Sequence, residues 1–272
     1  MIQAAKNPVG EWLIWRLVSS GVRKHFHAVH VRQRAPMASD DPAIPTIVYL
    51  NHSGWWDGHL CMILGRLVLQ KSSYMLVEEQ NLRRYRFFTW AGAFGVDRDD
   101  PRAALGSLAY ATGLLRADPR AAIFICPQGT IAPNDRRPLK FLRGIAHLAR
   151  SLDAVRLVPV AARYDFVQEQ QPEIFLSVGP ALLCAGAAIR PHALTTQLET
   201  ALTTELDALH GDIVAEQFAD FTTVLQGSSG IDRLFDRAMS RGRRESRRLR
   251  MEREAREQAA SIGLGDGSHQ AK

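Results

Sequence analysis

Short apolar runs alternate with longer segments of mixed polarity along most of the chain. The runs are rich in β-branched residues, and some are apolar throughout, such as Ala-Ala-Ile-Phe-Ile-Cys at residues 121–126. A continuous apolar run of this length is typical of a strand that is buried on both faces of a sheet. The pattern predicts strands at residues 28–32, 46–51, 72–77, 94–97, 121–126, 155–162 and 174–178.

Helix-length segments separate several of these runs, at residues 57–69, 80–91, 101–117 and 143–151. Further along, leucines recur at helical spacing and predict one long amphipathic helix, at positions 194, 198, 202, 206 and 209. Alternation of strands and helices indicates an α/β fold. We expect a single domain over residues 26–228, with a mixed, mostly parallel sheet flanked by helices.

The two ends of the chain have different patterns. Residues 1–25 contain an amphipathic helix in which Trp12 and Trp15 stand beside Arg16. Tryptophan beside cations suits the boundary between membrane and water, but the same pattern suits a helix that packs on the core of its own domain. Residues 229–272 lose apolar content. There we expect a basic, Arg-rich and partly disordered helical tail, which is either solvated or in contact with anionic lipid.

Composition limits the class of protein. Although the net charge is +6, no aromatic residues interleave the arginines between positions 241 and 250, so nucleic acid is not an expected partner. No run approaches the ~18 apolar residues that cross a bilayer. The three cysteines are too widely spaced for a disulfide framework or a metal site, which suits a reducing compartment. We expect peripheral attachment at the cytoplasmic face of a membrane, with no bound cofactor and no metal.

The segment after the second predicted strand carries candidate chemistry, because Asn51 is followed by His52, Gly54 and Asp57. Five positions on a straight helix would place the His and Asp side chains about 140° apart. They meet only if His52 lies in the turn and Asp57 begins the helix, and Gly54 gives that turn its freedom. A carboxylate beside an imidazole fixes its tautomer and makes the other ring nitrogen a better base toward a hydroxyl. Taken alone, such a pair is also compatible with a purely structural role.

Two further turns follow predicted strands. Residues 127–130 form a Pro-Gln-Gly-Thr turn, which can direct backbone N–H groups toward developing negative charge. Residues 92–98 bring Arg98 to the end of a strand, where a guanidinium can make forked contacts with an oxyanion or a hydroxyl-rich head group. Loops that follow parallel strands meet at one edge of the sheet. We therefore expect the three loops to form a single cleft.

Four segments resemble the ordered sequence blocks of the glycerolipid acyltransferase family, which includes 1-acylglycerol-3-phosphate and lysophospholipid acyltransferases. They are Asn51-His52-(four residues)-Asp57, Gly92…Arg98, Pro127-Gln128-Gly129-Thr130 and Val158-Pro159-Val160-Ala161. The resemblance covers roughly residues 45–165. Each block is short, but the four occur in the family's order and at its usual spacing.

The resemblance implies a role for each matching residue. His52 would be the general base, Asp57 would orient it, and Arg98 would help to bind the acceptor head group. Part of the acceptor and acyl site would be formed by the three residues Gln128, Gly129 and Thr130. The donor would be acyl-CoA or acyl-carrier protein, no metal would take part, and the fatty acyl group would move to a hydroxyl of a lipid acceptor.

Two positions depart from the family pattern. Gln128 stands where the family usually has Glu, and Ile131 stands where it usually has Arg. The missing guanidinium leaves two acceptor classes open: a lysophospholipid or glycerolipid, and a glycosylated lipid such as a carotenoid glycoside. Two other functions also stay open, namely a thioesterase or hydrolase that uses the same His and Asp, and a non-catalytic lipid-binding module.

Overall fold

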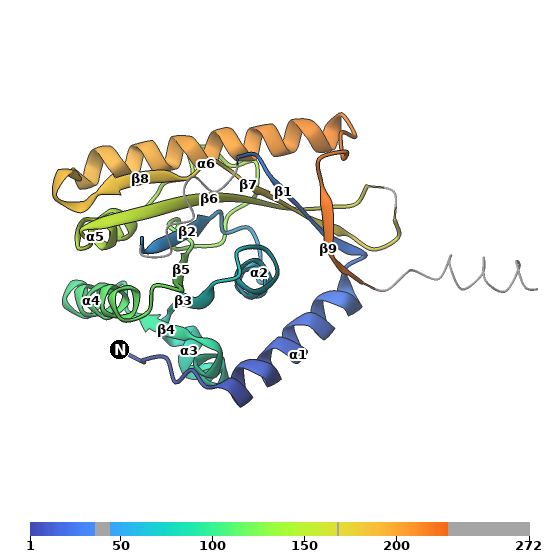
Figure 1. Ribbon diagram of the computed structural model, residues 1–272. Coiled ribbons are helices and arrows are strands. Elements are labelled where there is room, and N and C mark those ends of the chain that lie inside the picture. Colours follow the sequence, from blue (N-terminus) through green and yellow to red (C-terminus); the bar gives the residue numbers. More distant parts are fainter. Residues whose placement is uncertain (36–43, 168, 228–272) are drawn as a thin grey trace, which may run out of the picture. The chain divides into compact units, whose positions relative to one another are not determined.

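The computed structural model describes residues 1–35, 44–167 and 169–227, so the tail predicted over residues 229–272 lies outside the described part of the chain. Within the described residues, helices cover both faces of a nine-stranded sheet (Figure 1). Most strand pairs are parallel, and three are antiparallel. The predicted α/β fold with a mixed, mostly parallel sheet is confirmed.

The strands follow the order β4-β3-β5-β2-β6-β7-β1-β9, and β8 pairs with the beginning of β6. Their bounds are β1 Ala28–Gln33, β2 Thr46–Leu50, β3 Ser72–Glu78, β4 Ala93–Val96, β5 Ala121–Ile125, β6 Ala154–Asp165, β7 Glu173–Val178, β8 Leu182–Ala185 and β9 Thr222–Gln226. All seven strands predicted from apolar runs form. β8 and β9 are not predicted. Both are edge strands with mostly half-buried or exposed side chains; the apolar run of β8 is only four residues long, and β9 has no continuous apolar run.

The helices form at the segments that the sequence pattern predicts. Their bounds are α1 Pro8–His25, α2 Asp57–Ile63, α3 Glu79–Arg84, α4 Pro101–Ala117, α5 Gly144–Arg150 and α6 Pro191–Val214, with a π-helical turn η1 at Leu64–Val68 and 3-10 turns η2 at Arg86–Ala91 and η3 at Gly186–Ala188. The predicted helix at 101–117 matches α4 at both ends. The carboxylate of Asp100 caps it by accepting hydrogen bonds from the N–H groups of Arg102 and Ala103.

Alternate residues of the central strand β2 face two separate hydrophobic cores. Ile47 and Tyr49 pack with residues of α4, α5 and α6, whereas Val48 and Leu50 pack with residues of α1 and α2. A slip of one residue would exchange the two sets, so the packing on both faces fixes the register of the strand.

The β2–β6 pair continues past the end of β2. The side chain of Asn51 takes the place of a strand residue, because its Nδ2 donates to the carbonyl oxygen of Ala162 at 2.9 Å and its Oδ1 accepts from the N–H of Ala162 at 2.8 Å. β6 itself runs on to Asp165. The second half of β6 therefore lies beside the turn that begins at His52.

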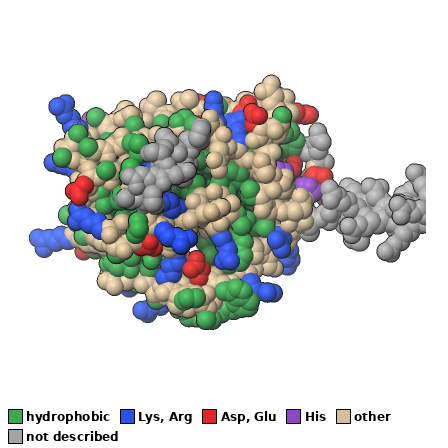
Figure 2. All heavy atoms as spheres, viewed as in Figure 1, with side chains coloured by type: hydrophobic (Ala, Val, Ile, Leu, Met, Phe, Trp, Pro, Cys, Tyr) green, Lys and Arg blue, Asp and Glu red, His purple; other side chains and the backbone are tan. Residues whose placement is uncertain are grey.

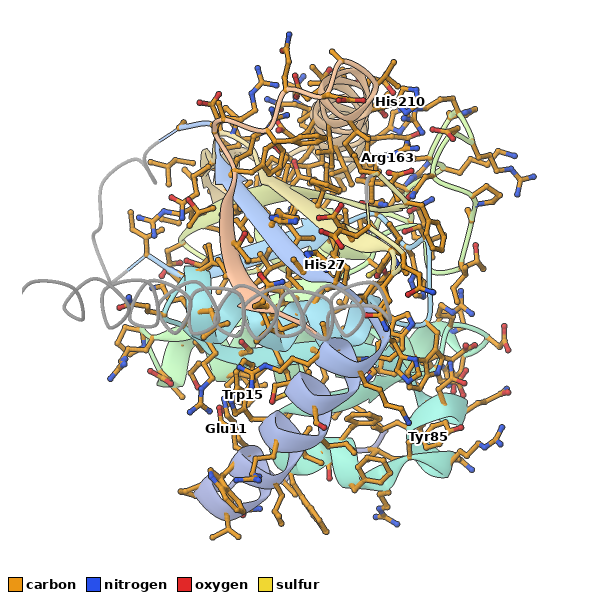
Figure 3. All side chains as sticks on the ribbon, turned by 90° about the vertical axis from the view of Figure 1, so that its right-hand side faces the viewer. Glu11, Trp15, His27, Tyr85, Arg163 and His210 are labelled. Atoms are coloured by element: carbon orange, nitrogen blue, oxygen red, sulfur yellow. The ribbon has the colours of Figure 1, made fainter. Side chains whose placement is uncertain are left out.

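Helix α1 has one buried face and one exposed apolar face. It begins after Asn7, whose side chain accepts a hydrogen bond from the N–H of Gly10 at 2.8 Å. Its buried face consists of Gly10, Ile14, Val18 and Val22. The opposite face exposes Val9, Trp12, Leu13 and Leu17. Hydrophobic side chains gather at the lower edge of the molecule where α1 lies (Figure 2), and the helix runs obliquely along the side of the domain (Figure 3). Among the described helices, none is both long and apolar enough to cross a membrane.

Candidate active site

His52 and Asp57 occupy the positions predicted for them, since His52 lies in the turn after β2 and Asp57 is the first residue of α2. His52 Nδ1 lies 2.7 Å from Asp57 Oδ2. Asp57 has no exposed surface, whereas 27% of the His52 side chain is exposed. An ionised carboxylate only accepts hydrogen bonds, so in the neutral imidazole Nδ1 carries the proton and Nε2 has the lone pair. The imidazole is thereby arranged as a base.

Four donors surround the buried carboxylate of Asp57. Oδ2 accepts from His52 and from the backbone N–H groups of Ser53 at 2.8 Å and Gly54 at 2.9 Å. Oδ1 accepts from the hydroxyl of Tyr164. A buried charge is costly unless it is paired and hydrogen-bonded, and this carboxylate is both. The backbone of the turn between β2 and α2 is thus held by hydrogen bonds to the carboxylate of Asp57.

Tyr164 is a site residue that the motifs do not identify. It lies near the end of β6, with its ring 5.7 Å from that of Phe26. Burial, reinforced by the charge of Asp57, raises the pKa of the Tyr164 hydroxyl well above its usual range, so this group stays protonated and donates. The available sequence signal is weak: a polar aromatic residue three positions after the Val-Pro-Val-Ala block.

The Pro-Gln-Gly-Thr turn holds the backbone of His52. Gln128 Oε1 accepts from the His52 N–H at 2.7 Å, and the Ala132 N–H donates to the His52 carbonyl at 2.8 Å. The Gly129 N–H donates to the carbonyl of Cys126 at 3.0 Å, so it closes the turn and is already engaged. Gln128 is buried and Thr130 is exposed, and neither lines the cavity described below. A glutamate would offer the same acceptor oxygen to His52, so Gln128 preserves this contact.

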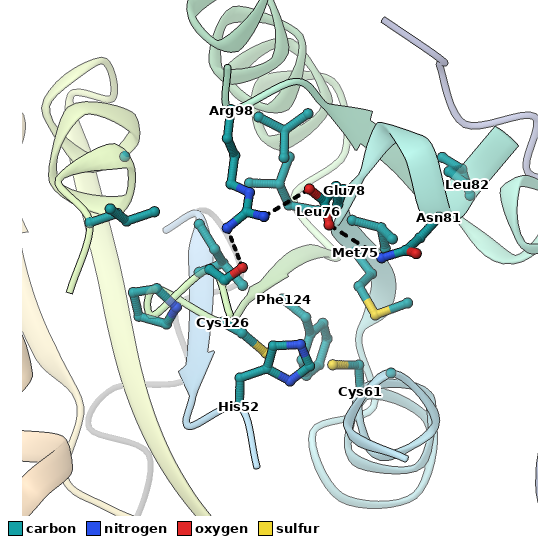
Figure 4. A pocket seen from close by; sticks show the side chains of 18 of the residues that line it. His52, Cys61, Met75, Leu76, Glu78, Asn81, Leu82, Arg98, Phe124 and Cys126 are labelled. Atoms are coloured by element: carbon teal, nitrogen blue, oxygen red, sulfur yellow. Dashed lines mark hydrogen bonds and ion pairs between the residues drawn. The ribbon is translucent and has the colours of Figure 1, made fainter. Parts of the chain in front are cut away.

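Arg98 leaves β4 and reaches the same turn. Its Nη1 donates to the carbonyl of Gly129, and its Nη2 donates to Glu78 Oε1 at 2.8 Å (Figure 4). Gly129 has φ of 69°, and a Cβ there would lie 2.8 Å from Arg98 Nη1, so this position favours glycine. Glu78 is the second residue that the motifs do not identify, because acidic residues at the start of a helix are common.

A cavity of about 540 Å³ opens beside His52 and Arg98. Its wall is mostly apolar and includes Cys61, Met75, Leu76, Val77, Leu82, Phe88, Leu108, Phe124, Ile125, Leu142 and Ile145. Among the described residues that line it, the acidic and basic side chains are those of Glu78 and Arg98. An apolar cavity with a few convergent polar groups is the usual form of a small-molecule site.

Two cysteines and a second histidine also lie at the cavity. Burial raises the pKa of the thiols of Cys61 and Cys126, so neither is a ready nucleophile. Burial lowers the pKa of His59 to about 4, which leaves this imidazole uncharged and suits a packing role against Trp55 and Trp56. His52, with its buried carboxylate partner, therefore remains the candidate base.

The Acyltransferase family model matches residues 28–163, which are 136 of the 272 residues and include all four blocks. The chain belongs to the acyltransferase family. It is an enzyme, and the family predicted from four short segments is confirmed. A comparison with curated proteins gave no match. Among solved structures, the chain is similar to the 1-acyl-sn-glycerophosphate (LPA) acyltransferase PlsC from Thermotoga maritima. The two sequences are 14% identical, the match covers 73% of this chain and 81% of that chain, and the TM-score is 0.46.

The substitution Tyr164→Phe tests the hydrogen bond to Asp57 Oδ1 in this acyltransferase. It keeps the ring against Phe26 but removes a donor to a buried charge, so we expect kcat to fall about tenfold with KM little changed. The control is Tyr49→Phe, which removes a buried hydroxyl on the other face of the sheet. Steady-state kinetics and thermal unfolding of both variants provide the comparison. An equal loss of kcat in the control would contradict the assigned role.

Proposed function

We propose that the enzyme transfers a fatty acyl group from acyl-CoA or acyl-carrier protein to a hydroxyl of a lipid acceptor. The observation that supports this proposal most directly is the position of the His52–Asp57 pair at the edge of a largely apolar cavity of about 540 Å³. Such a cavity can hold an alkyl chain, because burial of each methylene contributes about 0.8 kcal/mol. The carboxylate-bound imidazole supplies the base that a hydroxyl acceptor needs.

The proposed reaction proceeds by direct attack. His52 Nε2 takes the proton of the acceptor hydroxyl while the oxygen forms a bond to the thioester carbonyl carbon. The C–S bond then breaks, and the imidazolium returns the proton to the leaving thiolate. Asp57 holds the ring and stabilises the imidazolium between the two proton transfers. The products are an ester and a free thiol.

Removal of the base tests this mechanism. His52→Ala should abolish transfer, and Asp57→Asn should lower kcat by up to about 10⁴, because an amide no longer fixes the tautomer of His52. His147→Ala removes an exposed histidine of α5 and serves as the control. Release of free thiol and formation of ester product are measured together. Wild-type turnover by folded His52→Ala would exclude the mechanism, and thioester consumption that is independent of an added hydroxyl acceptor would identify a hydrolase instead.

We further propose peripheral attachment to a membrane through the exposed face of α1. Trp12 is 50% exposed, and the guanidinium of Arg16 lies 5.2 Å from its ring centroid. Aromatic rings beside cations favour the interfacial region of a bilayer. Trp55, also exposed, lines the cavity and contacts Trp56, which in turn contacts the end of α1 at His25. Attachment by this face would place lipid near the cavity.

Point substitutions test the proposed membrane-binding face of α1 better than deletion of the helix, because the other face of α1 is part of the hydrophobic core. Trp12→Ala combined with Leu17→Ala should weaken binding to anionic vesicles by roughly tenfold or more, because two apolar side chains no longer enter the interface. The control combines Leu105→Ala with Leu183→Ala, two exposed leucines on other elements. Equal vesicle binding by the two double variants in sedimentation would show that α1 does not contact the membrane.

For the acceptor, we propose a neutral glycosylated or polyol lipid in preference to a phosphate monoester. Ile131 is exposed and lines the cavity at the position where the family usually has an arginine. Arg98 is the remaining guanidinium among the described residues that line the cavity. A phosphate dianion binds best to several forked, permanently charged donors, and one of them is missing here.

Ile131→Arg tests this preference. The side chain of Gln128 is already hydrogen-bonded to the backbone N–H of His52. An added charge is therefore better placed at position 131, which is exposed and can reach an acceptor. The variant should raise kcat/KM for lysophosphatidic acid by about tenfold relative to a neutral monoacyl glycolipid. Ile131→Gln is the uncharged control of similar size. A wild-type enzyme that strongly prefers lysophosphatidic acid would refute the proposed acceptor class.

A further inference from the structure

An ion pair at the cavity wall controls how Arg98 can meet a ligand. Glu78 Oε1 lies 2.8 Å from Arg98 Nη2, and Asn81 Nδ2 donates to the other carboxylate oxygen at 3.4 Å (Figure 4). Arg98 Nη1 is engaged by the carbonyl of Gly129. All four residues line the cavity. Both terminal nitrogens of the guanidinium therefore already have partners within the protein.

The ion pair also sets the charge of the cavity wall. Among the described residues that line it, the charged side chains are one arginine and one glutamate, which cancel. A further negative charge lies behind His52, on Asp57. The wall itself therefore offers an anion no net positive charge, although the family resemblance assigns Arg98 to the acceptor.

The two classes of acceptor head group respond differently to this arrangement. A phosphate that binds Arg98 in a forked manner must displace the carboxylate of Glu78 or remain beside it, and like charges at contact distance repel. A neutral head group with several hydroxyls can donate to the carboxylate and accept from the guanidinium, so it uses both members of the ion pair. The pair is complementary to a hydroxyl-rich surface.

We infer that Glu78 is a specificity-determining residue, which selects uncharged, hydroxyl-rich acceptors and disfavours acceptors that carry a phosphate monoester. The inference rests on the proposed acyl transfer to a lipid hydroxyl. Glu78 occupies this position because β3 lies between β4, which leads to Arg98, and β5, which leads into the turn containing Gly129. Position 78 thus acts on the same head group as Arg98, with the opposite sign of charge.

Glu78→Gln separates the charge from the hydrogen bond, because the amide oxygen can still accept from Arg98 Nη2. With oleoyl-CoA as donor, kcat/KM is measured for lysophosphatidic acid and for a neutral monoacyl galactolipid. The ratio of the first to the second should rise about tenfold over wild type at low ionic strength and should rise less in high salt. Asp99→Asn is the control, since it removes an exposed carboxylate next to Arg98 in sequence but outside the cavity wall.

Each outcome has one meaning. An unchanged ratio in a Glu78→Gln enzyme that turns over both acceptors overturns the inference and leaves acyl transfer intact. An equal rise in Asp99→Asn also overturns it, because the effect is then one of general charge. Absence of transfer by the wild-type enzyme to every hydroxyl acceptor, with thioester hydrolysis instead, refutes the proposed function itself. If Glu78→Gln does not fold, Glu78→Ser is measured instead; it removes the charge together with the hydrogen bond to Arg98, and an unchanged ratio there also overturns the inference.

Discussion

The buried carboxylate of Asp57 is the interaction on which the active site depends. A charge without exposed surface is tolerated only when its lone pairs are satisfied, and the four donors come from the imidazole, from two backbone N–H groups of the turn and from Tyr164 of β6. These donors belong to separate parts of the fold. The same anion that orients His52 therefore also joins the end of β2, the start of α2 and the far half of β6.

That junction exists because β6 is longer than its neighbour. β2 ends at Leu50, opposite Val160, and β6 continues to Asp165. The amide of Asn51 occupies the next position of the ladder and satisfies both backbone groups of Ala162. The chain can then leave the sheet at His52 without an unpaired buried strand edge. A single asparagine thus allows the turn to form beside the part of β6 that supplies Tyr164.

The sequence predicts those features that depend on local signals. Short runs rich in apolar residues identify seven of the strands, and the Asp100–Pro101 start gives α4 its boundary. His52, Asp57 and Arg98 are predicted because each follows a recognisable strand within a block of the family pattern. Glu78 and Tyr164 are not, because their contacts follow from the lateral order of strands, with β3 beside β4 and β6 beside β2. The residues near positions 78 and 164 in the sequence do not indicate which strands will be neighbours in the sheet.

Apolar and polar parts of the cavity contribute differently to selectivity. Burial of an alkyl chain is non-directional, and one methylene changes binding by only about 0.8 kcal/mol, so a largely apolar wall discriminates weakly between similar chains. A polar head group that leaves a carboxylate or guanidinium without a hydrogen-bond partner loses much more binding free energy. On the proposed function, acceptor choice should therefore depend on the few polar side chains beside His52. Under that proposal, the uncharged side chain of Ile131 and the neutralised Glu78–Arg98 pair would both act in favour of an uncharged acceptor.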